Sequence, residues 1–345
     1  MMKKKIATKK FVVIFLYFLL SFPIGYYAYK YGSPDVGGQK DFYSYYPLYK
    51  DYNISATESP FNMRLVGSYL VHLMSKTDIY YNIKICFSNA TIEQEIYFDV
   101  ILFNYISAVF TCFIIFLMIF NLYKNIFFSF SIGLLYFFQY GTIYWGINGC
   151  ADGFSALLFA LFFYCYILRS YWVIPLLALT VFQRDIILIT VLSLSFIELL
   201  FNKNRKYFLI VFSSSLLFFI FHIILRETIF YTKRWNEILE PGSFLEKAFT
   251  PTISIVSYIR QSLINQNILI LYLLIVAYKL YNKIEIKKIN LIITVSVFLV
   301  INIISFALLA ADNAGRYFYI SSAMLIFYLA NELFSLIPDK VKMIE

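Results

Sequence analysis

The sequence predicts an all-α, polytopic membrane protein that forms a single integral membrane domain over residues 1–345. Of its 345 residues, 61% are hydrophobic and 14% are charged, whereas soluble domains have about 45–50% apolar and about 25% charged residues. The apolar residues gather in runs, and a helix needs about 20 apolar residues to cross about 30 Å of hydrocarbon. The net charge of +9 falls mainly in short loops between these runs. It therefore indicates membrane topology and not nucleic-acid binding.

Eight apolar runs are candidate membrane segments: residues 11–29, 99–120, 126–146, 152–168, 207–225, 267–281, 289–310 and 317–337. A further run, residues 171–202, would measure about 48 Å as one helix, too long for one span and too short for two full ones. The basic residues between runs should stay on the cytoplasmic side. They do so only if residues 171–202 form a short helical hairpin with Gln183, Arg184 and Asp185 at its tip. We therefore expect about ten membrane segments, with both termini cytoplasmic.

The first run follows five lysines, as in a signal peptide. Its length and the lack of a small-x-small cleavage site predict a retained anchor instead.

This topology puts residues 30–98 and 226–266 on the outer face as two loops. Both exceed the usual connector of about 4–6 residues, so we expect interfacial helices in the first loop. From Pro60 to Met74, apolar residues recur at helical spacing after a proline suited to a helix start. The opposite side carries Arg64, Ser68 and His72 at i, i+4 and i+8. This pattern predicts an amphipathic helix at the interface with a polar stripe.

Charged residues at the outer ends of the spans are candidates for function. An Asp or Arg inside hydrocarbon costs about 2.5–3.5 kcal/mol on insertion scales, so such residues ordinarily face a polar cavity. The outer ends carry four such residues, and the same face carries two more in the first loop: Asp152, Arg184, Asp185 and Arg316, with Asp41 and Arg64. A set drawn from five regions but confined to one face predicts a single outward-facing cavity.

Each of these residues also has a structural interpretation that stays open. Arg184 and Asp185 could neutralise one another at the hairpin tip, and Arg316 could pair with Asp312 at i, i+4. Asp152 could be the N-cap of its own span, and Asp41 a solvated loop acid or a helix cap.

The composition argues against a histidine- or cysteine-rich metal centre and against a Ser-His-Asp catalytic triad. The four cysteines show no metal-ligand spacing, and the two histidines are too few for a histidine-rich metal centre and argue against a Ser-His-Asp triad. No cofactor is predicted with certainty. A magnesium or manganese ion held by Asp41 and another acid stays open, because oxygen-only sites have no readable spacing.

Taken together, these motifs resemble the bacterial C-type (GT-C) glycosyltransferases, polytopic enzymes that use polyprenyl-phosphate-linked sugars. The resemblance lies in Asp41 with Tyr45 four residues later, and in Pro60-Phe61-Asn62-Met63-Arg64-Leu65 opening an amphipathic helix. It continues with Asp152 at a span start, Gln183-Arg184-Asp185 at a hairpin tip and Ala314-Gly315-Arg316-Tyr317-Phe318 opening the last span. Family members show a proline after the last-span arginine, where this chain has Ser321 and Ser322.

The resemblance implies that Asp41 is the catalytic carboxylate and that the protein lies in the bacterial cytoplasmic (inner) membrane with its active site facing outward. The second acidic position is open between Asp51, Glu58 and Asp152. A phosphate leaving group needs charge neutralisation more than a proton, so one base on the acceptor hydroxyl suffices and the anomeric centre inverts. Arginine suits the phosphate, and the candidates are Arg64, Arg184 and Arg316, with Asp152, Asp185 and Tyr45 lining the cavity.

The expected partners are a polyprenyl-phosphate-linked sugar, an acceptor glycan, lipid or protein, and the lipid bilayer, with no nucleic acid. Two other functions stay open. One is a polysaccharide or O-antigen-type polymerase acting on lipid-diphosphate oligosaccharides. The other is a lipid-linked sugar transporter or flippase without catalysis, although we see no inverted repeat of the kind that transporters show.

Overall fold

The computed structural model describes residues 2–31, 40–57, 61–77, 92–150, 152–202, 205–230, 263, 266–309 and 318–337. Within these ranges the chain forms helices and turns and no strand. The all-α fold expected from the sequence is therefore confirmed for the described residues.

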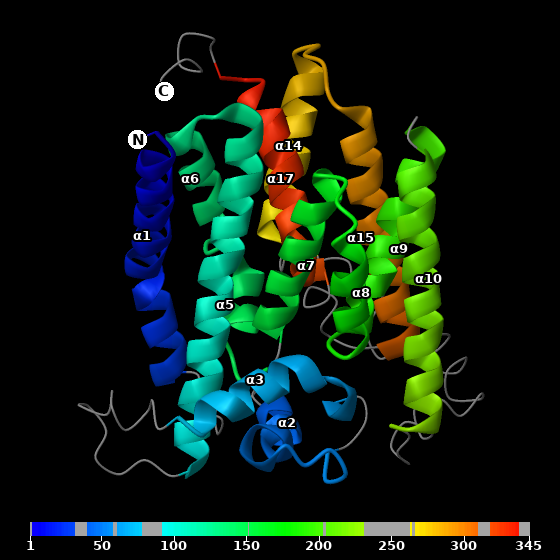
Figure 1. Cartoon of the computed structure of the whole chain (residues 1–345). Helices are drawn as coiled ribbons and strands as arrows, with labels where there is room; N and C mark the ends of the chain where they lie inside the picture. The colour runs from blue at the N-terminus through cyan, green and yellow to red at the C-terminus, as the bar shows by residue number, and fades with distance from the viewer. Residues whose placement is uncertain are drawn as a thin grey trace.

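Most helices run upright and side by side, while two short ones lie across the lower end of the bundle in Figure 1. The crossing helices are α2 (Lys40–Asp51) and α3 (Leu65–Ser75). We call the end of the bundle near α2 and α3 the lower end, and the end where α1 starts and α17 finishes the upper end. The upright helices are α1 (Met2–Tyr31), α5 (Ile92–Tyr123), α6 (Ile126–Leu134), α7 (Asp152–Ile167), α8 (Val173–Val181), α9 (Asp185–Phe201), α10 (Arg205–Thr228), α14 (Asn267–Tyr281), α15 (Lys288–Leu309) and α17 (Ser322–Phe334).

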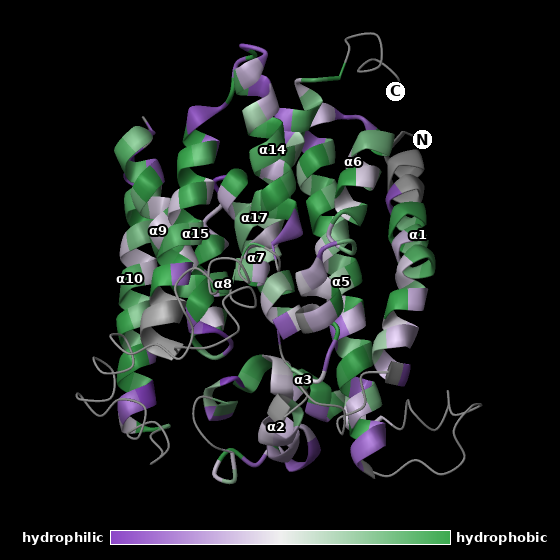
Figure 2. Cartoon of the chain, turned by 180° about the vertical axis from the view of Figure 1, so that it is seen from behind, coloured by the Kyte–Doolittle hydropathy of each residue, from purple (hydrophilic) through white to green (hydrophobic). Residues whose placement is uncertain are grey.

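Helix α5 is the central element, since it packs against α1, α3, α6, α7 and α17. A second group forms where α9 packs against α10 and α15, and α7 contacts α8, which joins the two groups. Hydrophobic residues cover most of the length of the upright helices, and hydrophilic residues gather at their ends and turns (Figure 2). This distribution is typical of a helical membrane protein, since no water reaches the bilayer core.

Three described helices are long and apolar enough to cross a membrane: Lys10–Lys30 in α1, Glu93–Tyr123 in α5 and Arg205–Thr228 in α10. The expected number of about ten membrane segments is therefore not supported. The physical reason is length, because a full span takes about 20 residues and the apolar segments of the other helices, including Lys288–Ile303 within the 22-residue α15, are shorter. These are Leu65–Ser75, Asp152–Ile167, Asn267–Tyr281, Lys288–Ile303 and Ser322–Phe334.

Residues 171–202 do form two short helices, α8 and α9, which contact each other. The turn between them runs from Phe182 to Arg184, with the Gln183 and Arg184 backbone N–H groups donating to the Thr180 carbonyl at 3.1 and 3.0 Å. The hairpin turns back at the lower end of the bundle (Figure 1). It thus delivers its polar tip to the level of α2 and α3.

The helix expected from Pro60 to Met74 is broken at Arg64. A short 3₁₀ helix, η1 (Phe61–Met63), precedes it, and α3 begins at Leu65. Arg64 and Ser68 are buried, while Tyr69 and Leu73 are exposed. The predicted polar stripe therefore faces the protein at these two positions, because α3 packs on α2 and α5, and Arg64 binds the Tyr45 hydroxyl of α2 there.

Three turns at the upper end each place a basic residue in the left-handed region of backbone space. Lys124, Arg169 and Lys283 have φ of 56°, 53° and 55° and follow α5, α7 and α14. A residue with a side chain pays about 1–2 kcal/mol for this conformation, which glycine adopts readily. Each cation sits beyond a helix C-terminus, where it interacts favourably with the helix dipole.

Candidate functional site

A buried ion pair joins the hairpin tip to the start of α7. The Arg184 Nε donates to Asp152 Oδ1 at 2.8 Å, and Arg184 Nη2 contacts the same oxygen. The exposed fractions of the two side chains are 2% and 0%. The predicted pairing of Arg184 with its neighbour Asp185 therefore gives way to a pairing with Asp152, 32 residues away in sequence. Asp152 begins α7, as expected, and its carboxylate binds the hairpin arginine.

Gln183 ties the hairpin tip to α3 as well as to α7. Its Oε1 accepts the Gly67 backbone N–H at 2.8 Å, and its Nε2 donates to Ser155 Oγ at 3.0 Å. The Val66 N–H donates to the Phe182 carbonyl at 3.3 Å. A side chain at Gly67 would have its Cβ 3.0 Å from the Gln183 amide oxygen. A residue with a side chain at position 67 would therefore require the Gln183 amide to shift by a few tenths of an ångström.

Arg64 lies at the start of α3, between aromatic rings from α2 and η1. Its Nη1 donates to the Tyr45 hydroxyl. The guanidinium carbon lies 5.4 Å from the Tyr45 ring centroid and 5.2 Å from that of Phe61, within the range of cation–π attraction. Tyr45 in turn stacks on Tyr49 with centroids 5.5 Å apart. The first loop thus folds Tyr45 and Arg64 onto one another, although 19 residues separate them.

Asp185 lies among several cationic groups at the lower end. Its Oδ1 accepts its neighbour's N–H, that of Ile186, at 2.9 Å. Burial raises the pKa of the Asp185 carboxyl, but the charges of His222, Arg184, Arg64 and Arg226 lower it, so that the pKa lies below its ordinary value. Elements α3, α9 and α10 therefore bring their charges to one place.

The remaining predicted site residues are placed as follows. Asp41 lies in the first turn of α2, one turn before Tyr45, and its side chain lies outside the description. Arg316 and Glu58 lie outside the described residues. Asp51 ends α2 and is exposed. Most of the second loop, 226–266, also lies outside the description.

Two polar residues on α5 were not singled out from the sequence. Asp99 is only 4% exposed, and its Oδ1 has no hydrogen-bond partner among the described residues. Asn104 Nδ2 donates to the Asn148 and Cys150 carbonyls at 2.7 and 2.6 Å, which fixes the turn just before Asp152. Both could have been found as polar residues within an apolar run, where they ordinarily mark function or packing.

Metal binding gains no geometric support at this site. In the part of the chain that the structure describes, no three His, Cys, Asp or Glu side chains are grouped so that they could hold a metal ion.

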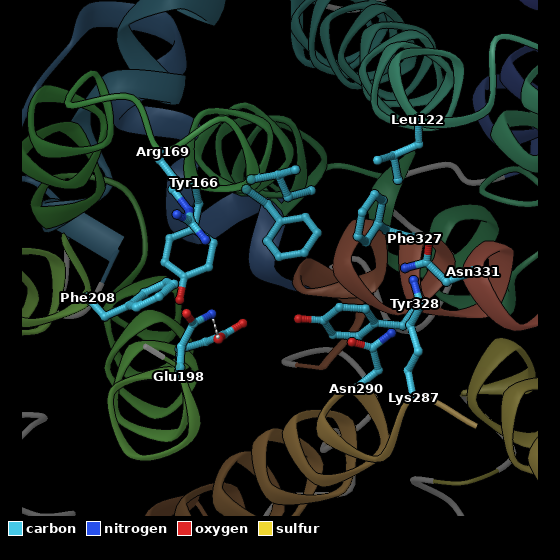
Figure 3. Close-up of a pocket in the computed structure, with 13 residues that line it drawn as sticks. Leu122, Tyr166, Arg169, Glu198, Phe208, Lys287, Asn290, Phe327, Tyr328 and Asn331 are labelled. Carbon is cyan, nitrogen blue, oxygen red and sulfur yellow. Dashed lines mark hydrogen bonds between the residues drawn. The ribbon is translucent and has the colours of Figure 1, made fainter. Parts of the chain in front are cut away.

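A cavity of about 440 Å³ lies at the upper end, away from the predicted site residues, and Figure 3 shows the residues that line it. Its lining comes from α5, α7, α9, α10, α15, α17 and adjoining turns. The cavity expected from the sequence was to lie at the other end, around Asp152 and Arg184. These two side chains form a buried ion pair between α7 and the hairpin, and the cavity expected around them stays a prediction.

Fold and hydropathy define the class of this chain as an all-helical membrane protein. Comparison with known proteins goes no further, since no family model, curated protein or solved structure matches it.

Proposed function

We propose that this protein is an inverting glycosyltransferase that moves a sugar from a polyprenyl-phosphate-linked donor to an acceptor glycan, lipid or protein. The supporting observation is the convergence of Arg64, Arg184, Asp152 and Asp185 at the lower end, from three separate regions of the sequence. This convergence agrees with the resemblance to GT-C glycosyltransferases, because the same four residues belong to the motifs on which that resemblance rests. The lower end then faces the outside of the bacterial cytoplasmic membrane.

In this mechanism Asp41 accepts the proton of the acceptor hydroxyl as its oxygen attacks the anomeric carbon. The bond between that carbon and the phosphate oxygen breaks, and the polyprenyl phosphate leaves with the bonding electrons. One displacement without an enzyme nucleophile inverts the anomeric centre. The leaving group gains negative charge, which fixed guanidinium groups stabilise at low energetic cost.

Arg64 is the better described candidate for binding the donor phosphate. Its guanidinium is held between the Tyr45 and Phe61 rings and by the Tyr45 hydroxyl. A guanidinium carries five N–H donors in a rigid fork, so the rings fix its plane for a bidentate partner. Arg316 is the second proposed phosphate ligand. Arg184, bound to Asp152, holds the hairpin tip in position and shapes the site.

The test is sugar transfer by purified protein in liposomes, measured with a polyprenyl-phosphate sugar and a cell-envelope acceptor. Asp41→Asn should lower turnover by about 10²–10⁴, the usual contribution of a positioned base. Glu93→Gln, at an exposed acid at the lower start of α5, is the matched control and should transfer normally. Near-normal transfer by Asp41→Asn would remove Asp41 from this role.

The product distinguishes the alternatives. Chain lengthening of a lipid-diphosphate oligosaccharide would favour a polymerase over single-sugar addition. Movement of a lipid-linked sugar across the bilayer without a new glycosidic bond would favour a flippase.

A further inference from the structure

The upper-end cavity has a chemical character that transfer at the lower end does not use. Leu122, in the last turn of the span in α5, and Phe208, near the start of the span in α10, both line it. The cavity therefore lies at the level where these spans end, which is the boundary between hydrocarbon and headgroups. Phe163 and Phe327 add apolar surface.

The interior offers hydrogen-bond donors that the described residues leave unused. Tyr166 is 5% exposed and Asn290 is 7% exposed. Neither the Tyr166 hydroxyl nor Asn290 Nδ2 has a hydrogen-bond partner among the described residues. Figure 3 shows Tyr166 on one side of the cavity and Asn290 and Tyr328 on the other. Buried donors without partners are costly, so they point to a ligand that accepts hydrogen bonds from both sides.

The charges around the cavity favour an anion. Arg169 and Lys287 are both exposed and contribute two positive charges, against the single carboxylate of Glu198. Asn202 Nδ2 donates to Glu198 Oε2 at 3.1 Å, so this carboxylate already has a partner. The cavity is therefore rich in donors and carries an excess of positive charge.

The fold fixes the position of Lys287 through a buried ion pair. Lys279 Nζ contacts Glu332 Oε2, and both side chains are almost fully buried. The other carboxylate oxygen, Oε1, accepts the Lys287 backbone N–H at 3.2 Å. The end of α14, the start of α15 and the end of α17 are thus held together beside the cavity.

We propose that this cavity binds a phosphate ester carried by the headgroup of a membrane lipid. The phosphate would lie between Arg169 and Lys287 and accept hydrogen bonds from Tyr166 and Asn290, while the apolar residues at the hydrocarbon boundary contact the start of an acyl chain. Basic pockets between membrane helices bind phospholipid headgroups by the same combination of charge and hydrogen bonding. This site is independent of the proposed transfer reaction.

The experiment titrates the full-length protein in detergent with phosphatidylglycerol and counts bound lipid by native mass spectrometry. Lys287→Gln should weaken saturable binding by about 10-fold, the loss expected from one charge-assisted hydrogen bond. Tyr166→Phe should weaken it by a smaller factor. Lys288→Gln removes the same charge one residue further along, and Tyr171→Phe removes an exposed hydroxyl. Both are controls outside the lining and should bind as the unchanged protein does.

Competition with glycerol 3-phosphate then identifies the source of the phosphate. No displacement of phosphatidylglycerol at millimolar concentration supports a lipid headgroup, whereas displacement that depends on Lys287 assigns the same anion site to a soluble ester. Equal losses for Lys287→Gln and Lys288→Gln would overturn the proposal, because they would show only attraction to a basic surface. Lys287 is exposed, so the variant tests binding without removing a core side chain.

Discussion

Among the described residues, each end of the bundle contains one buried ion pair, and the two pairs differ in their surroundings. At the upper end, Lys279 and Glu332 are completed by neutral partners, the Ser335 hydroxyl at 2.9 Å from Lys279 Nζ and the Lys287 backbone N–H. At the lower end, the pair of Arg184 and Asp152 has further charged groups nearby. A pair completed by neutral groups holds helices together, whereas a pair within a larger set of charges can also respond to a charged ligand.

The lower end gathers charges of both signs around its buried pair. Arg64, Arg184 and Arg226 lie there with the carboxylates of Asp152, Asp185 and Glu227. The guanidinium groups of this set can stabilise an anion that arrives with a substrate, as the proposed donor phosphate does. We expect the following experiments to separate the two ends.

Removing one charge from either buried pair should give the largest loss of stability. Asp152→Asn and Glu332→Gln each leave a buried cation without its partner, which costs about 3–5 kcal/mol. Thermal unfolding in detergent measures the loss. The exposed pair of Arg226 and Glu227, with N and O 3.3 Å apart, is the control, because Glu227→Gln should cost less than about 1 kcal/mol. Equal losses for all three variants would contradict the distinction between buried and exposed pairs.

Gln183→Leu should give the next largest effect. It removes the hydrogen bonds to Gly67 and Ser155 and leaves a buried N–H without a partner, at a cost of about 1–3 kcal/mol. The same measurement should show a change below about 0.5 kcal/mol for Glu93→Gln, at an exposed position. Because Gln183 links α3 to the hairpin, proteolysis should also cut the first loop faster in this variant. Unchanged proteolysis would argue against that link.

Replacing a whole pair by apolar residues should affect stability less, since such replacements are often neutral or stabilising. Lys279→Met with Glu332→Leu should keep sugar transfer. Asp152→Leu with Arg184→Met should fold and yet lose transfer, because the lower pair holds the tip beside the proposed site. The assay is transfer per folded protein. Loss of transfer in the upper double variant would remove the contrast between the ends.

The smallest effect concerns how the free energy of unfolding declines at low pH. The pKa of Asp185 is lowered in the folded protein, so its contribution is present above the unfolded pKa of about 3.9 and is lost as the pH falls through the folded value. Stability should therefore be insensitive to Asp185 between pH 5 and 7 and decline below about pH 4. Asp185→Asn should make that decline shallower in unfolding curves recorded from pH 7 to pH 3. An unchanged slope would contradict the electrostatic grouping at the lower end.

Much of the fold follows from hydropathy and charge. Apolar runs predicted the positions of most helices, and the distribution of basic residues predicted the hairpin at residues 171–202 before any geometry was considered. The number of full spans was wrong because a run of apolar residues does not show where a helix ends. The run 126–146 illustrates this, since it contains α6, a turn and the π-helical residues Thr142–Gly146.

The site could be predicted only in part. Charge patterning identified Arg184 and Asp152, but not that they pair, because side chains distant in sequence meet only through helix packing. The inward orientation of Arg64 and Ser68 was missed, since the sequence shows a polar stripe but not which surface covers it. The upper cavity combines side chains from six helices, and spacing along the chain carries no signal for that.

In each of the left-handed turns after α5, α7 and α14, one basic residue must both adopt a strained backbone conformation and supply a positive charge. Glycine at Lys124, Arg169 or Lys283 would relax the backbone, and it would also delete a charge that orients a nascent helix during insertion. A glycine variant should therefore be more stable than the unchanged protein after purification, and it should insert less well into the membrane of the living cell. A screen for thermal tolerance in detergent alone would select changes that the insertion machinery rejects.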